Sequence, residues 1–383
     1  MDINANGINL HFEDHGAGDA TLVFLHYWGG TSRTWDNVIK ALKSDVRSVA
    51  FDARGWGKSD RPESGYDIVS MADDVEAAIA ALELKKYILV GHSMGGKVAQ
   101  LLASRRPAGL TGLVLVAPSP AQGKLLPEDI REGMEGAYAV AESTAWTIDN
   151  VLAELPLSPA LREQVIEDSV GGASAAKRYW PAGAISEDVS ADLGRIQVRV
   201  LVIGGEKDKV DSVELLETVV VPSLPGAQLT VIPGVGHLSP LESPREVASR
   251  IDSFLAGGIA RTPHPEDVAT AFDSALNSGN VDSVMALFHP KAVMRMTDRS
   301  VVEGGPEASR GDIEKLVSLK PILKNTVRRV LKSGDIALLL LDWEIRVAPD
   351  GHSSVQRGTA TQIVERSTTG NWQLRVSNPL GIE

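Results

Sequence analysis

The sequence contains no cysteine, which excludes disulfide bonds, a thiol nucleophile and every metal site built on cysteine. It also lacks any apolar run approaching the ~18 residues that a membrane-spanning helix requires. The chain has fewer positive than negative side chains, with 38 Lys and Arg and 50 Asp and Glu, which gives a formal net charge of −12. Nucleic acids and anionic membranes attract basic surfaces, so we expect neither as a partner.

The first residues do not show the basic, apolar and small-residue order of a signal peptide, so we expect a cytoplasmic protein. No cluster of metal-ligating residues stands out either, and we expect neither a metal nor a cofactor. What the chain does have is length. Its 383 residues, 43% of them hydrophobic and 23% charged, are typical of globular proteins and favour two domains.

Residues 86–103 predict a strand, a tight turn and a helix in direct succession. Residues 87–90 form the short apolar run of a strand that is covered on both faces. Between strand and helix lies the pattern G-x-S-x-G, which places Ser93 on a sharp turn flanked by Gly91 and Gly95. The turn presents the hydroxyl at the start of a helix, where backbone amides favour negative charge. Apolar side chains then recur at helical spacing, at Met94, Val98, Leu101 and Leu102.

A serine on such a turn resembles the nucleophile elbow of the α/β-hydrolase superfamily, and the resemblance covers residues 1–257. The strands and helices predicted up to Ser93 alternate, which requires a parallel sheet with right-handed crossovers and agrees with an α/β fold. The resemblance further implies a catalytic serine, an acid and a histidine in that chain order, each in its own loop.

By this resemblance the acid is Asp208, which follows the strand predicted at residues 198–204 with the spacing G-x-x-D. Asp211, three residues later, is a competing candidate. The base is His237, in the glycine-rich loop after the strand predicted at residues 229–232. We expect an acid and a base at these positions to complete the triad of the nucleophile.

The loop after the strand predicted at residues 21–25 reads HYWGG, residues 26–30. In the family this loop usually begins His-Gly-X, and the amide of X is one donor of the oxyanion hole. The resemblance therefore implies that Trp28 donates, together with Met94, the residue after the nucleophile. Tyr27 departs from the pattern, because a glycine is usual at its position.

Residues 121–193 read as short helical segments interrupted by prolines, with no candidate strand. In the family this is the place where a helical cap is inserted over the active site. Large side chains in the cap and beside the catalytic loops are available to contact a substrate. The candidates are Tyr27, Trp146, Tyr179, Trp180 and Leu238.

Small residues and a proline at positions 256–263 predict a linker, so that the hydrolase domain spans residues 1–257 and a second domain residues 263–383. Two helical faces open the second domain, at residues 268–276 and 281–288, and alternating strands follow. This order resembles the cone-shaped α+β fold of nuclear transport factor 2-like, SnoaL-like proteins. One strand predicts a buried row of Leu341, Trp343, Ile345 and Val347.

Some relatives of that fold are isomerases that use an aspartate and a tyrosine, but no tyrosine follows Tyr179 here. We therefore expect the second domain to be non-catalytic, and to form a homodimer or to cover the pocket of the first. Its remaining polar candidates, none with an identified partner, are Asp298, Asp342, His289 and His352.

The chemistry that these residues imply is the transfer of an acyl group to water, with a small ester or lactone as the expected substrate. Carbon–carbon bond hydrolysis and cofactor-free perhydrolysis use the same triad and stay as alternatives. A hydrolase-like binding protein without turnover belongs to another class of function. The presence of all three triad residues and both elbow glycines disfavours it.

Overall fold

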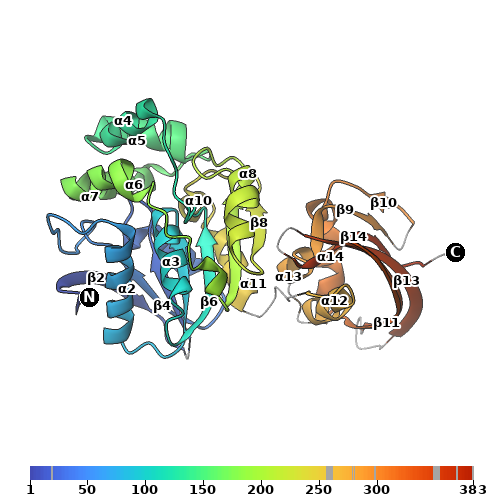
Figure 1. Cartoon of the computed structure of the whole chain (residues 1–383). Helices are drawn as coiled ribbons and strands as arrows, with labels where there is room; N and C mark the ends of the chain where they lie inside the picture. Colours follow the sequence, from blue (N-terminus) through green and yellow to red (C-terminus); the bar gives the residue numbers. More distant parts are fainter. Residues whose placement is uncertain are drawn as a thin grey trace. The chain divides into compact units, whose positions relative to one another are not determined.

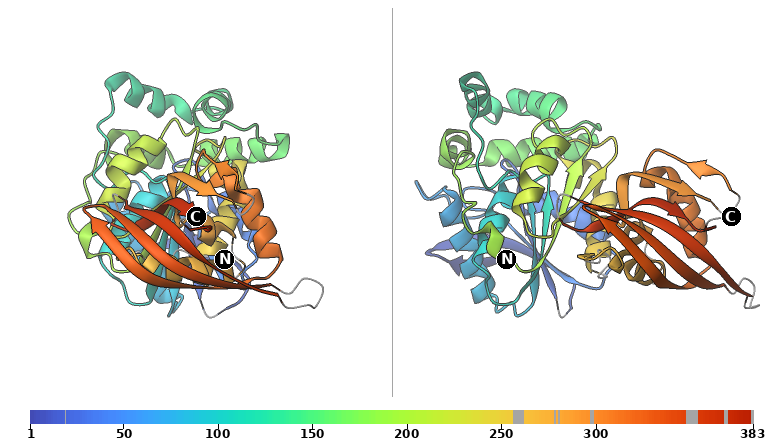
Figure 2. Two further views of the ribbon diagram at one scale, coloured as in Figure 1. Left: turned by 90° about the vertical axis from the view of Figure 1, so that its right-hand side faces the viewer. Right: turned by 45° about the vertical axis from the view of Figure 1, so that its right-hand side comes forward.

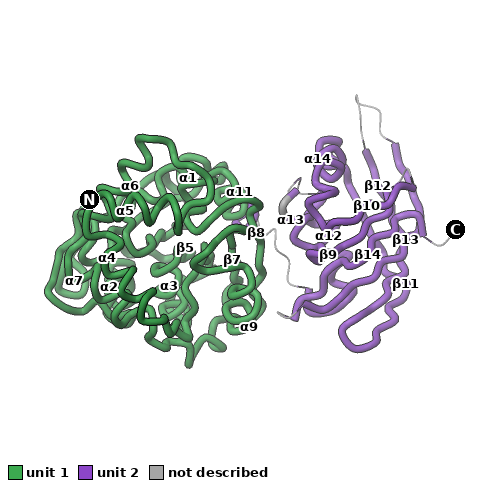
Figure 3. The backbone as a smooth tube through the Cα atoms, turned by 90° about the horizontal axis from the view of Figure 1, so that it is seen from above, with its two compact units in different colours: residues 1–251 green, residues 252–383 purple. Residues whose placement is uncertain are grey.

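The computed structural model describes residues 1–18, 20–255, 262–277, 279, 281–296, 299–347, 354–367 and 370–381. The chain forms two compact units, Met1–Ile251 and Asp252–Glu383 (Figure 3). Most of the predicted linker lies outside the described residues, as do the candidates Asp298 and His352.

The first unit is built on an eight-stranded sheet (Figure 1). Its strands are β1 (Asp2–Ala5), β2 (Ile8–His15), β3 (Thr21–Leu25), β4 (Arg47–Phe51), β5 (Tyr87–His92), β6 (Leu110–Val116), β7 (Arg199–Gly205) and β8 (Gln228–Ile232). They lie in the order β1-β2-β4-β3-β5-β6-β7-β8, and β2 is antiparallel to both neighbours whereas the rest are parallel. The carboxyl ends of the parallel strands therefore meet at one edge, where open α/β sheets bind ligands.

The helices of this unit cover the sheet, and every residue of β3 and β5 is buried. Helix α3 packs against β5, β6 and α2. The helical segments outside the β6–β7 connection are η1 (Ser32–Trp35), α1 (Asp36–Ala41), α2 (Ile68–Ala81), α3 (Met94–Ser104), α8 (Val213–Leu215), η5 (Leu216–Val220), α9 (Val221–Ser223), α10 (Ser239–Glu242) and α11 (Pro244–Leu255).

The connection between β6 and β7 is helical, and residues 117–198, all of them described, contain no strand. Its segments are α4 (Glu128–Ala137), α5 (Ala141–Thr147), η2 (Ile148–Leu152), α6 (Pro159–Gly171), α7 (Ser174–Tyr179), η3 (Trp180–Ala184) and η4 (Leu193–Arg195). Its far end is tied to α3, because the buried Lys97 ammonium donates to the carbonyls of Ala184 (3.0 Å) and Ile185 (2.9 Å). We call residues 121–193 the cap.

The second unit pairs a six-stranded, strongly curved sheet with three helices (Figure 2). The strand order is β10-β9-β14-β13-β12-β11, and the helices and sheet enclose a separate core. The elements are α12 (Asp267–Asn277), α13 (Val281–Met285), β9 (Phe288–Arg295), β10 (Val301–Val302), η6 (Pro306–Ser309), α14 (Arg310–Ser318), β11 (Ile322–Ser333), β12 (Ile336–Val347), β13 (Ser354–Arg366) and β14 (Trp372–Asn378). Together the two units confirm the predicted fold classes.

Two details of the second unit differ from the prediction. Phe288 does not extend the second helix but begins β9, which pairs with β14. Of the predicted buried row, Leu341 is fully buried, whereas the following alternate residues are only half-buried. The reason is that the core of this unit is centred on the first half of β12, beside Leu339 and Leu341. The residues that extend beyond it are Trp343, Ile345 and Val347.

Candidate active site

Ser93 lies on a strained turn between β5 and α3, with φ 51° and ψ −109°. L-residues other than glycine rarely adopt this conformation, and such strain concentrates at functional sites. The turn is tight enough to require glycine on both sides. A Cβ on Gly91 would lie 2.4 Å from the Gly95 carbonyl oxygen, and a Cβ on Gly95 would lie 2.5 Å from the Leu25 carbonyl oxygen.

The loops after β7 and β8 bring an acid and a histidine together. The Nδ1 of His237 lies 2.9 Å from an oxygen of Asp208, and both side chains are buried. The other Asp208 oxygen accepts the amides of Val210 (2.7 Å) and Asp211 (2.9 Å), which fixes the carboxylate. His237 therefore donates through Nδ1, and its Nε2 is left as the basic nitrogen.

Asp211, the competing acid, contacts Lys124 at 2.5 Å. No hydrogen bond joins it to His237 among the described residues. Burial raises the pKa of Asp211, and the Lys124 charge opposes that rise. Of the two candidates, only Asp208 has the contact with the base that a triad requires.

The electrostatic surroundings of His237 favour its charged form. Burial by itself lowers the pKa of His237. The negative charge and hydrogen bond of Asp208, together with the charge of Asp211, raise the pKa by more than burial lowers it. The pKa of His237 is therefore raised above its ordinary value of 6.5. An imidazole with this property is suited to take a proton and hold it during a reaction.

The histidine loop lies beside the nucleophile elbow. The carbonyl of His237 accepts a hydrogen bond of 2.9 Å from Nε2 of His92, the residue that precedes Ser93. The two imidazole rings have centroids 5.2 Å apart. The nucleophile, the acid and the base thus gather at the carboxyl ends of β5, β7 and β8.

The backbone amides of Trp28 and Met94 meet the requirement for oxyanion donors, because neither donates to an acceptor among the described residues. The amide of Gly95 donates to the carbonyl of His26 (3.1 Å), which joins the elbow to the loop after β3. The ring of His26 bonds two further backbone groups beside this loop. The ring of His26 donates from Nδ1 to the Tyr27 carbonyl (2.7 Å) and accepts the amide of Ala53 at Nε2 (2.9 Å).

The substrate-contact candidates are placed less favourably. Tyr27 and Leu238 belong to a buried apolar cluster, and Trp180 is buried in the main core. Trp146 is 62% exposed and Tyr179 is 39% exposed. Trp146 projects from α5 on the side opposite the buried Thr144, so its position gives no support to the prediction that it lines a pocket.

Tyr138, at the end of α4, is the cap residue that meets the loop after β3. Its hydroxyl donates to the carbonyl of Trp28 (3.0 Å), and the two rings have centroids 4.3 Å apart. Ser169 of α6 holds the next residue, donating 2.8 Å to the carbonyl of Gly29. The cap therefore lies directly over the predicted oxyanion loop.

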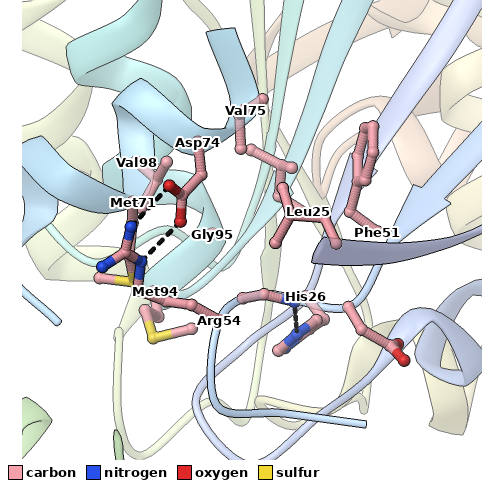
Figure 4. Close-up of a pocket in the computed structure, with 13 residues that line it drawn as sticks. Leu25, His26, Phe51, Arg54, Met71, Asp74, Val75, Met94, Gly95 and Val98 are labelled. Atoms are coloured by element: carbon pink, nitrogen blue, oxygen red, sulfur yellow. Dashed lines mark hydrogen bonds and ion pairs between the residues drawn. The ribbon is translucent and has the colours of Figure 1, made fainter. Parts of the chain in front are cut away.

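A small cavity of about 30 Å³ lies behind the elbow and the oxyanion loop (Figure 4). Met94 and His26 contribute to its wall, and a buried ion pair between Arg54 and Asp74 (both contacts 2.6 Å) borders it. The cavity has room for little more than a water molecule and does not reach Ser93. It is too small to hold a substrate.

No metal or membrane feature stands out in the part of the chain that the structure describes. There, no three histidine, aspartate or glutamate side chains gather as metal ligands would. None of the described helices combines the length and apolar character needed to cross a bilayer.

Comparison with known proteins identifies the family of the fold. The model of the alpha/beta hydrolase family matches residues 22–250, which is more than half of the chain. The chain belongs to the alpha/beta hydrolase family. A model of the SnoaL-like domain matches residues 268–367 of this alpha/beta hydrolase.

Similar proteins carry varied names. AB hydrolase superfamily protein YisY of Bacillus subtilis is 32% identical over 213 residues, covering 53% of this chain and 79% of YisY. A 2-hydroxymuconate semialdehyde hydrolase of Pseudomonas sp. is 29% identical over 272 residues, covering 67% of this chain and 93% of the relative. The solved esterase of Exiguobacterium antarcticum superposes with a TM-score of 0.62 at 24% identity, over 67% of this chain and 98% of the esterase. That last likeness is one of fold.

Proposed function

We propose that this alpha/beta hydrolase cleaves a carboxylic ester or lactone through an acyl-enzyme on Ser93. The observation that carries the proposal is the strained Ser93 turn beside the hydrogen-bonded pair of His237 and Asp208 (2.9 Å). The unpaired amides of Trp28 and Met94 give further support, because an oxyanion hole needs free donors at this place.

In the proposed reaction, the Ser93 hydroxyl gives its proton to Nε2 of His237 while its oxygen attacks the substrate carbonyl. The amides of Trp28 and Met94 receive the negative charge that develops on the carbonyl oxygen. The tetrahedral intermediate then expels the alcohol, which takes the proton from His237. Water repeats the sequence on the acyl-enzyme and releases the acid. Asp208 stays ionised throughout and stabilises the charged imidazole.

A panel of p-nitrophenyl esters and lactones, run on the purified chain and on Ser93→Ala, tests the proposal. Ser119→Ala is a matched control. The Ser119 amide donates to the Ser93 carbonyl (3.1 Å), but its buried hydroxyl has no partner among the described residues. We expect turnover by the parent and the control and none by Ser93→Ala. Turnover by Ser93→Ala equal to that of the parent would refute the assignment of Ser93 as the nucleophile.

Carbon–carbon bond hydrolysis is the second candidate, because the relative from Pseudomonas sp. is named 2-hydroxymuconate semialdehyde hydrolase, which is a carbon–carbon bond hydrolase. Adding a vinylogous diketone to the panel separates the two reactions. A chain that cleaves the diketone and leaves every ester intact would favour carbon–carbon cleavage.

For the second unit we propose a homodimer formed through the outer face of its sheet. The first residues of the edge strand β11 are unsuited to pairing with another chain, because side chains of helix α12 bond their backbone. The Asn277 side chain bonds both the amide (2.7 Å) and the carbonyl (2.8 Å) of Leu323, and Asp273 accepts the amide of Asn325 (2.7 Å). We therefore place the partner on the face of the sheet and not at this bonded end of its edge.

The outer face carries an apolar stripe with charges of both signs beside it. Residues paired across four strands form the stripe, namely Leu331, Leu338, Ile363 and Val376. Beside it, Arg328 pairs with Asp342 (3.2 Å) and Arg357 with Glu344 (2.8 Å). Two copies related by a two-fold axis can exchange such charges reciprocally, which favours a second copy of this chain as the occupant.

Leu331→Glu tests this surface, since Leu331 is 53% exposed in the stripe. Leu319→Glu is the matched control, because Leu319 is 45% exposed but follows α14, off the sheet. We expect light scattering to find a dimer for the parent and the control and a monomer for Leu331→Glu. A monomeric parent would contradict the dimer.

A further inference from the structure

His92 connects the nucleophile strand to the loop that carries the base. It is the last residue of β5, directly before Ser93, and its side chain is fully buried. Its Nε2 lies 2.9 Å from the carbonyl oxygen of His237. A carbonyl oxygen only accepts hydrogen bonds, so Nε2 carries the proton.

The other ring nitrogen fixes the protonation state. Nδ1 of His92 is buried and has no hydrogen-bond partner among the described residues. A second proton there would be a buried charge without an acceptor, so the ring is neutral. The titratable groups around it are Tyr27, with ring centroids 5.1 Å apart, and His237, at 5.2 Å, and His26 acts from a greater distance. Burial and the neighbouring His237 both lower the pKa of His92, which agrees with the geometry.

Three hydrogen bonds hold His237 in place. Its amide donates to the carbonyl of Leu152 in the cap (2.8 Å), and its Nδ1 bonds Asp208 after β7 (2.9 Å). The bond from His92 is the one that starts on the strand of the nucleophile. Loss of that bond leaves His237 tied to the cap and to β7, with no direct bond to the β5 end beside Ser93.

We propose that His92 is a positioning residue, whose neutral Nε2–H sets the distance between His237 and Ser93. The inference rests on the proposed function. It assigns a task to the residue that G-x-S-x-G leaves unspecified, and it accounts for a polar side chain in the fully buried end of β5. His92 touches no reacting atom in this scheme and acts through His237.

The test measures the reactivity of Ser93 without knowledge of the natural substrate. A fluorophosphonate probe phosphonylates an activated serine, with fluoride as the leaving group and the serine proton passing to the base. We compare the parent with His92→Leu, which lacks a donor, and with His92→Gln, whose amide reaches the place of Nε2. His92→Asn carries the same amide on a side chain that is one carbon shorter. Ser119→Ala is the control for a substitution next to Ser93 that leaves His92 unchanged.

We expect His92→Leu and His92→Asn to react about 10²-fold more slowly, the cost of misplacing a catalytic group by ~1 Å. His92→Gln should recover most of that loss, and Ser119→Ala should match the parent. The bond between His237 and Asp208 stays in every variant, so the midpoint of the acid limb of the pH profile should stay at the value of the parent. Recovery of the rate in His92→Gln but not in His92→Asn depends on the position of one amide donor, and a merely structural role would not produce it.

The outcomes separate the two proposals. A parent that the probe does not label at Ser93 overturns the proposed function and the role of His92 with it. A labelled parent together with an unchanged labelling rate in His92→Leu overturns the role of His92 alone. Thermal unfolding shows whether each variant is folded. If His92→Leu is not, equal labelling of His92→Gln and His92→Asn overturns the inference.

Discussion

Replacing Gly95 by alanine should damage stability and activity together, because one added methyl group would collide with two neighbouring backbone carbonyls. The new Cβ would lie 2.5 Å from the Leu25 oxygen, 2.6 Å from the His26 oxygen and 2.7 Å from the Leu25 carbonyl carbon. Cβ atoms essentially never approach so closely. A flexible side chain could turn aside, but these atoms belong to the end of β3 and the start of the next loop.

Overpacking of a well-packed site costs about 1–3 kcal/mol. We place Gly95→Ala near the upper end, at about 3 kcal/mol, because the neighbours are backbone. Relief of the clash must push His26 away and lengthen its 3.1 Å hydrogen bond from the Gly95 amide. Trp28 lies two residues further along, so its amide moves as well. Loss of one oxyanion donor lowers kcat by about 10²-fold or more.

The assays are urea unfolding and hydrolysis of the best ester of the panel. Gly133→Ala is the matched control, since Gly133 lies inside α4 and a Cβ there meets nothing within 4 Å. Removing glycine from a helix interior stabilises by about 0.5–1 kcal/mol. We therefore expect the two variants to change stability in opposite directions. A Gly95→Ala protein as stable and active as the parent would refute the close-contact argument.

The remaining predictions concern the triad, its pH dependence and the second unit. Ser93→Ala should lower kcat by about 10⁶-fold and His237→Ala by a comparable factor, because the residues of a triad act as one unit. Asp208→Asn should lower kcat less. If Asp211→Asn lowers kcat more than Asp208→Asn does, the assignment of Asp208 as the acid is wrong. Because the pKa of His237 is raised above 6.5 and the base must be neutral, kcat/KM should fall as pH falls through a midpoint above 6.5. Asp208→Asn should lower that midpoint, and a flat profile between pH 5 and 8 would contradict a histidine base. Truncation after Gly258 should leave a folded monomer that still hydrolyses a small ester, as measured by light scattering and the same ester assay. A dimeric truncated protein would refute dimerisation through the second unit. A truncated protein that is folded but inactive would mean that this unit helps to build the pocket.

Local chemistry explains why the elbow could be predicted from sequence. A buried strand, a G-x-S-x-G turn and a helix follow one another within 18 residues, so neighbouring residues carry the whole signal. The loops of Asp208 and His237 were predictable because each follows an apolar strand and because the resemblance to α/β-hydrolases implies the order serine, acid, histidine. The catalytic roles themselves stay predictions until the variants are measured.

Signals that depend on distant partners were missed. Nothing in the spacing of the sequence indicates that Arg54 pairs with the buried Asp74 of α2 through two contacts of 2.6 Å, in addition to its hydrogen bond to the carbonyl of Ser64 (3.4 Å). This pair forms because the fold brings the two side chains together, which spacing along the chain does not reveal.

The cap shows the same limit most clearly. Glu242 in α10 accepts three amides on one oxygen, from Gly236 (3.0 Å), Glu154 (2.9 Å) and Leu155 (2.8 Å). The first of these amides belongs to the loop of the base and the other two to the cap. Together with the bond from the His237 amide to Leu152, this carboxylate joins cap and base loop into one hydrogen-bonded body. It follows that the segment of the cap around residues 152–155 cannot move away from the site without moving the base.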